Sequence, residues 1–152
     1  MTPTDVLTLA AGVATALVGG VLLAFSAFVM TGLRALPPAA GAEAMRAVNR
    51  AALRPPLMLV LLGALLLDLA AAVVAVAGDA PSAGSAVAGA ALYVVGGIGV
   101  TAVGNVPLNE RLARTADPAG EWVRSAPRWV AWNHVRALAC AVAATFLLLA
   151  AR

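Results

Sequence analysis

The stretch LMLVLLGALLLDLAAAVVAVA, residues 57–77, decides the fold. Asp68 is its one charged side chain. A bilayer core is crossed by about 20 mostly apolar residues in a helix. Only helices and closed barrels can span a bilayer, and the run shows no alternation of the kind that barrel strands have. It therefore predicts a transmembrane helix.

Three further runs meet the same criterion, at residues 6–33, 86–108 and 129–150. Of the 152 residues, 62% are hydrophobic and 11% are charged, whereas soluble domains are about half apolar and a quarter charged. These numbers predict an all-α fold, a four-helix transmembrane bundle that forms a single integral membrane domain over residues 1–152. Small residues inside the spans permit close helix contacts, and the glycines of the first and third spans are compatible with a homo-oligomer.

Arginine supplies all ten basic residues, and eight of them lie in two connectors, at residues 34–56 and 109–128. The loop between the second and third spans has none, and Arg152 is the one basic residue near a terminus. The positive-inside rule predicts that both connectors are cytoplasmic and both termini outside, in a bacterial-type plasma membrane. Because the arginines lie between apolar runs, we expect the lipid bilayer and its anionic headgroups to be the binding partner, and we expect no binding of nucleic acid.

Both connectors are predicted to contain a cytoplasmic amphipathic helix. In the first, a charged face opposes an apolar one that includes Met45, and Pro55-Pro56 ends the pattern. Asn49 falls on the apolar face beside Met45. In the second, the helical wheel separates a polar side (Glu121, Arg124, Arg128) from an apolar side (Trp122, Ala126, Trp129).

The third span ends in GNVPLNERLAR, residues 104–114. Residues four apart share a helix face, so Asn105 and Asn109 form a polar stripe with Thr101. Pro107 lacks an N–H group and crowds the carbonyl of Val103, which predicts a kink beside the stripe.

The fourth span opens with RWVAWNHVRALAC, residues 128–140. Its wheel places five side chains within roughly 100° of one another: Trp129, Trp132, Asn133, Arg136 and Cys140. Arg136 lies nearly two turns inside the span, where a guanidinium costs at least a few kcal/mol and usually marks a function or a partner. His134 is about 100° away from Asn133 and lies off this face.

The polar faces are expected to converge on one pocket near the cytoplasmic boundary, apolar and tryptophan-lined on one side and amide-rich and cationic on the other. Structural roles remain open for each residue: helix capping for an asparagine, an interfacial anchor for a tryptophan, snorkelling for Arg136 and an interfacial position for His134. Asp68 is either protonated or paired with Tyr93 or Thr15. The chain has no histidine or cysteine pair with metal-ligand spacing, so no metal or other cofactor is expected.

Three motifs together, NVPLNERLA at 105–113, WVAWNHVRALA at 129–139 and MRAVNR at 45–50, resemble the anthrone oxygenase-like family of small four-span membrane proteins. Some fungal members oxidise an anthrone to an anthraquinone with molecular oxygen and without a known metal or flavin. The resemblance carries over to seven positions: Asn49, Asn105, Pro107, Asn109, Trp132, Asn133 and Arg136. It implies a monooxygenase that acts on a small aromatic or lipophilic, polyketide-like molecule.

In this hypothesis the catalytic residues are Asn109, Asn133, Arg136 and His134, and the substrate-binding residues are Asn49, Asn105, Trp132, Trp129 and Met45. The amides and Arg136 would stabilise an anionic oxygen, and His134 or water would take the proton. Two alternatives remain open. The protein could be a non-catalytic binder or carrier of a small lipophilic molecule, or an accessory membrane subunit whose polar stripe meets a partner.

Overall fold

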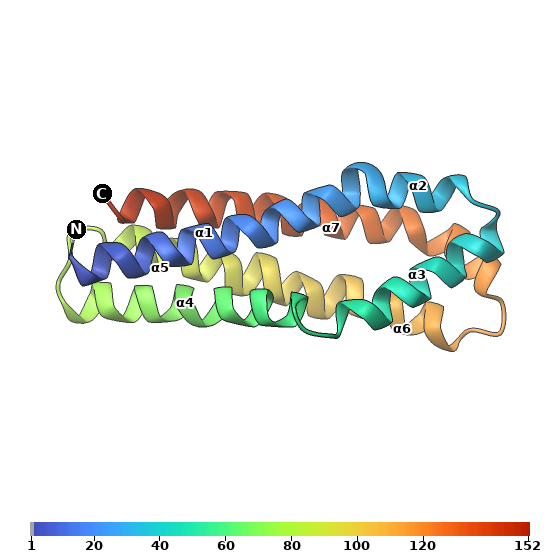
Figure 1. Cartoon of the computed structure of the whole chain (residues 1–152), viewed down its shortest axis with the longest axis horizontal. Helices are drawn as coiled ribbons and strands as arrows, with labels where there is room; N and C mark the ends of the chain where they lie inside the picture. Colours follow the sequence, from blue (N-terminus) through green and yellow to red (C-terminus); the bar gives the residue numbers. More distant parts are fainter. Residues whose placement is uncertain (1) are drawn as a thin grey trace.

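The computed structural model describes residues 2–152, and within this range the chain is helical with no strand. Four helical stretches are long and apolar enough to cross a membrane, which makes the protein an integral membrane protein: Pro3–Ala35, Leu57–Ala77, Ala83–Arg114 and Pro118–Ala150. They lie side by side along the long axis of the molecule (Figure 1). Both chain ends lie at one end of the bundle, and the Arg-rich connectors lie at the other.

The first stretch is α1 (Pro3–Ala24), a π-helical segment η1 (Phe25–Val29) and α2 (Met30–Ala35). The second is α4 (Leu57–Ala77). The third begins as α5 (Ala83–Leu92), widens into the π-helical segments η2 (Tyr93–Gly99) and η3 (Thr101–Asn105), and ends as α6 (Val106–Arg114). The fourth is α7 (Pro118–Ala150), and α3 (Pro38–Ala52) connects the first stretch to the second.

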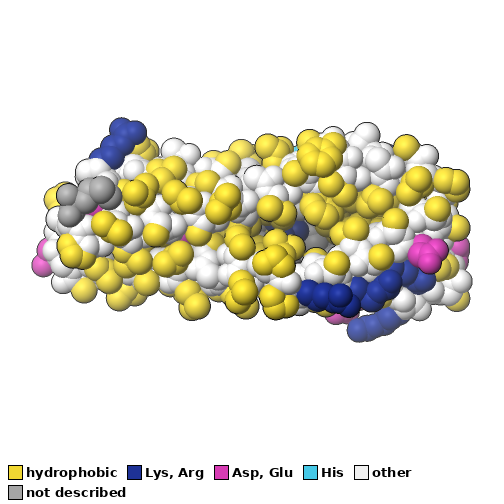
Figure 2. Space-filling view, in the orientation of Figure 1, with side chains coloured by type: hydrophobic (Ala, Val, Ile, Leu, Met, Phe, Trp, Pro, Cys, Tyr) yellow, Lys and Arg dark blue, Asp and Glu magenta, His cyan; other side chains and the backbone are white. Residues whose placement is uncertain are grey.

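Close packing of α7 against its neighbours depends on small residues. A Cβ atom added to Gly12 of α1 would lie 2.8 Å from Leu148 Cγ, and one added to Gly89 of α5 would lie 2.7 Å from Leu147 Cγ. In a bilayer, where lipid is as apolar as leucine, such contacts supply much of the helix association. Large apolar side chains point outward instead, among them Leu17, Leu66 and Leu138, and the surface in Figure 2 is largely hydrophobic.

The irregularity expected at Pro107 takes the form of the π-helical segment η3 rather than a break. The N–H of Val106 donates to the carbonyl of Thr101, five residues back. Pro107 has no N–H to continue an α-helical pattern, and a wider turn just before it accommodates the ring. This turn carries Asn105, which is 1% exposed and faces the bundle interior.

The two amphipathic connectors differ in form. α3 is the separate helix expected for the first connector, with Met45 buried and Arg50 exposed. The second connector is helical with the expected faces, but it is the N-terminal part of α7, which continues through Pro127 into the span. Trp122 and Ala126 pack with Met45 and Met30 in one buried cluster, so this part of α7 projects beyond the apolar stretch instead of lying flat.

Asp68 is fully buried in the centre of the bundle. Of the two partners considered, the structure gives Thr15, whose hydroxyl donates to both carboxyl oxygens at 2.9 Å. The hydroxyl of Tyr93 donates to the carbonyl of Leu61 at 3.0 Å. The bond from Thr15 to Asp68 joins α1 to α4. It satisfies a carboxyl group that has no access to water, and buried polar groups without a partner are costly.

We predict that Thr15→Val lowers the stability of the bundle by about 1.5 kcal/mol, because the carboxyl group of Asp68 loses its donor. Thr145→Val is the matched control: Thr145 is exposed, and its hydroxyl donates to Ala141 of its own helix. The measurement is the thermal unfolding midpoint of each variant in detergent micelles. A midpoint for Thr15→Val no lower than that of Thr145→Val would contradict this role for the bond.

Candidate active site

A cavity of about 150 Å³ opens between α1, α3, α4, η3 and α7. Most of its wall is apolar, from residues such as Val18, Leu22, Phe25 and Leu57. Figure 2 shows a hollow on this face of the molecule, with atoms of a basic side chain visible inside it. Six polar residues line the cavity: Asn49, Thr101, Asn105, Asn109, Asn133 and Arg136.

Arg136 brings a positive charge into this apolar cavity. Its side chain is 7% exposed, and its Nη1 donates to Oδ1 of Asn133 at 3.2 Å. Among residues 2–152 it has no acidic partner within 4.0 Å, and its Nε has no hydrogen-bond acceptor. A buried charge without a counter-ion costs several kcal/mol, so the site favours a ligand that brings negative charge or strong acceptors.

Asn133 orients that guanidinium. Its Nδ2 donates to the carbonyl of Leu22 at 2.6 Å and to Oγ of Ser26 at 2.8 Å. These bonds fix the amide with its oxygen toward Arg136, and they join α7 to the junction of α1 and η1. Asn133 is fully buried, so this orientation is enclosed by protein.

Asn105 and Asn109 hold the third stretch against α7 through one residue, Trp129. Nδ2 of Asn105 donates to the carbonyl of Trp129 at 3.0 Å, and Oδ1 of Asn109 accepts from Nε1 of Trp129 at 2.8 Å. The first bond fixes which end of the Asn105 amide carries oxygen. That atom, Oδ1, is buried and has no donor among residues 2–152.

α3 covers the cavity from the side of the connectors and is fastened by Arg46. Nε of Arg46 donates to the carbonyl of Leu112 at 2.8 Å, and Nη2 donates to the carbonyls of Ala113 and Thr115 at 3.3 and 3.4 Å. A cation at the C-terminal end of α6 satisfies free carbonyls and favours the helix dipole. Asn49 is thereby held at the rim of the cavity.

A second hollow of about 500 Å³ runs between α3 and α6. It shares four lining residues with the cavity: Asn49, Leu53, Val106 and Asn109. The cavity alone is smaller than the roughly 300–1,000 Å³ of typical small-molecule sites. A ligand with several rings would therefore extend from the cavity into this groove.

Six of the nine site residues proposed from the sequence line the cavity, and Met45, Trp132 and His134 do not. Met45 is buried beneath α3, in a cluster with Trp122 and Trp129. Trp132 is 41% exposed and packs on Gly104, where an added Cβ would lie 2.7 Å from its Cγ. His134 is exposed and lines a separate groove between α1 and α7.

The sequence reasoning did not find the contribution of the first stretch. Val18, Leu22 and Phe25 form cavity wall, and Ser26 holds Asn133. The only signal was Ser26 itself, a hydroxyl in a long apolar run. Within residues 2–152 no group of three or more histidine, cysteine, aspartate or glutamate side chains is arranged to hold a metal ion.

No curated protein and no solved structure was found to match the chain. A family model described as anthrone oxygenase matches residues 44–146. This range covers more than half of the chain and contains all six polar residues that line the cavity. The chain therefore belongs to the anthrone oxygenase family.

Proposed function

We propose that the protein is a membrane-embedded monooxygenase that oxidises a flat, lipophilic aromatic ketone of the anthrone type with molecular oxygen in this cavity. The observation that carries the proposal is Arg136, a buried guanidinium in a mostly apolar cavity, with no counter-ion among the residues that the structure describes, 2–152. Such a group favours a substrate that becomes anionic after it binds. Family membership supports the same reaction class.

The chemistry begins with the acidity of the substrate. The methylene carbon of an anthrone loses a proton readily, because the negative charge moves to the carbonyl oxygen and the central ring becomes aromatic. Arg136 would donate to that oxygen, with its guanidinium already oriented by Asn133. Donors fixed in advance in a water-poor site stabilise developing charge strongly, since no solvent has to reorganise.

The anion then reduces oxygen. One electron passes to O₂, the carbon radical and superoxide combine into a C–O bond, and protonation gives a hydroperoxide at the former methylene carbon. Loss of the second proton from that carbon breaks the O–O bond, which leaves a new carbonyl group and water. One oxygen atom enters the product and the other leaves as water. Both electron pairs come from the two C–H bonds, so the balance needs no further reductant.

The proton acceptor in this proposal is water rather than His134. No carboxylate and no imidazole is among the cavity-lining residues, all of which lie within residues 2–152. His134 lies on the outer groove between α1 and α7. In the orientation that the arginines favour, the cavity lies near the cytoplasmic boundary, and the groove between α3 and α6 offers water a short route.

A second contact would orient the substrate. Oδ1 of Asn105 has no donor in the described part of the chain, residues 2–152, and the bond from its Nδ2 to Trp129 prevents the amide from turning round. A hydroxyl group on the ring system could donate to this oxygen while the ketone oxygen accepts from Arg136. We therefore propose hydroxylated anthrones as substrates.

We predict that Arg136→Gln lowers oxygen uptake with an anthrone substrate by about 100-fold or more, the usual effect of losing an oxyanion donor. Uptake is measured with an oxygen electrode on protein purified in detergent, after subtraction of spontaneous oxidation. Wild-type uptake no faster than that background would overturn the enzymatic proposal and favour a binder or carrier. Equal uptake by wild type and Arg136→Gln would remove Arg136 from the mechanism.

We predict that His134→Gln retains the wild-type rate within about twofold, because His134 lies outside the cavity and surface substitutions have small effects. The same oxygen-uptake assay, run across a range of pH, checks this. A large loss of rate, or a shifted pH profile, would return His134 to the role of proton acceptor.

We predict that Asn105→Leu reduces selectivity for a hydroxylated substrate by about tenfold, the usual cost of one unmet hydrogen bond in a buried site. The measured quantity is the ratio of kcat/KM between the best monohydroxyanthrone and unsubstituted anthrone. General damage to the fold affects both substrates and cancels in the ratio. Thr101→Val is the control, since the Thr101 hydroxyl donates to Gly97. An unchanged ratio in Asn105→Leu would show that another group meets the amide oxygen.

A further inference from the structure

A separate hollow of about 210 Å³ lies between the end of α6 and the beginning of α7. It shares no lining residue with the cavity. Its wall combines one apolar residue, a serine, a carboxylate and three arginines: Leu108, Ser125, Glu121, Arg111, Arg124 and Arg128. The reaction proposed above uses none of them.

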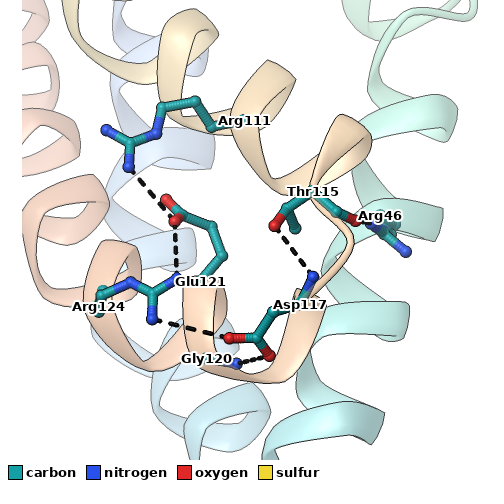
Figure 3. A network of polar contacts seen from close by, with 7 residues as sticks. All are labelled: Arg46, Arg111, Thr115, Asp117, Gly120, Glu121 and Arg124. Carbon is teal, nitrogen blue, oxygen red and sulfur yellow. Dashed lines mark hydrogen bonds and ion pairs between the residues drawn. The ribbon is translucent and has the colours of Figure 1, made fainter.

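The charge around the hollow is not balanced. Glu121 is 5% exposed, and its Oε2 accepts from Nη2 of both Arg111 and Arg124 at 3.3 Å (Figure 3). Arg128 has no ion pair among residues 2–152. Three cations face one carboxylate, an excess of two. Exposed Asp117, 3.8 Å from Arg124, still leaves an excess of one when it is counted.

Glu121 also arranges the site. Because one buried carboxylate oxygen binds two guanidinium groups from different helices, Arg111 and Arg124 converge on Glu121 (Figure 3). The N–H groups that face neither Glu121 nor Asp117 remain available to another anion. Arginine donors in such fixed positions suit the several oxygens of a phosphate group.

The position of the hollow suggests where that phosphate comes from. Leu108 ends the apolar part of the third stretch, and Arg128 directly precedes the apolar run of the fourth, so the hollow lies where both runs end. We propose that this hollow binds the phosphate of an anionic phospholipid, with the acyl chains on the Leu108 side. Basic pockets between helices at a membrane boundary suit such headgroups.

A lipid bound here would brace the cavity from outside. It would contact both α6 and α7, the helices that Asn109 and Trp129 join at the cavity wall. The lipid would thus reinforce a contact between these helices that already includes the bond of Asn109 to Trp129, the ion pair of Arg111 with Glu121 and the buried cluster that contains Leu112.

The test is a titration with phosphatidylglycerol, followed by native mass spectrometry of the protein released from neutral detergent, with phosphatidylcholine as the uncharged reference. We expect Arg128→Gln to weaken retention of phosphatidylglycerol by about fivefold, the share of one arginine near a headgroup. Arg114→Gln is the matched control, because Arg114 is 79% exposed, pairs with Glu110 at 3.4 Å and lies outside the hollow. That variant should retain the lipid as wild type does.

Equal weakening in Arg128→Gln and Arg114→Gln would overturn the proposal, since it would indicate diffuse attraction to the whole basic surface. Unchanged retention in Arg128→Gln would overturn it as well. A third arm adds inorganic phosphate to the lipid-bound protein at the same concentration as the lipid. Loss of phosphatidylglycerol would reassign the hollow to a free phosphate ion, whereas continued retention supports the lipid.

Discussion

The hydrogen bonds of Asn133 are the constraint on which the site depends. One amide joins the carbonyl of Leu22, the hydroxyl of Ser26 and the guanidinium of Arg136. This single side chain therefore fixes both the contact between α1 and α7 and the orientation of the Arg136 guanidinium. Because these atoms are enclosed in an apolar bundle, any rearrangement would leave polar groups unpaired, and this makes the geometry rigid.

The four spans could be predicted because length and hydropathy are properties of the local sequence. Residues 57–77 were placed at the bounds of α4, whereas the other three helices run past their apolar parts: the first and third end at Ala35 and Arg114, and the fourth begins at Pro118. In the fourth helix the excess has a physical cause. An amphipathic segment that finds an apolar neighbour, as Trp122 and Ala126 of α7 do, continues the helix instead of turning onto the surface.

The polar side of the cavity could also be predicted, since an amide or guanidinium in an apolar run must face the protein interior. Its apolar side could not. Val18 and Leu22 of the wall are aliphatic, as are Leu17 and Leu23, which are 60% and 56% exposed. Only packing decides between them. The same holds for Trp132, whose place on Gly104 turns it outward although it is adjacent to Asn133 in the sequence.

The 33 residues of α7 form a rod about 50 Å long, and the hydrocarbon core is only about 30 Å thick. Arg136 lies near the middle of that rod, nearly two turns inside the apolar run that begins at residue 129. In the reaction proposed above, dioxygen and the planar aromatic substrate both concentrate in hydrocarbon, so each would reach the protein by lateral diffusion within the bilayer. The released protons would leave toward water, on the side of the connectors. The membrane boundary would thus supply oxygen and substrate from the hydrocarbon and let the protons pass into the aqueous phase.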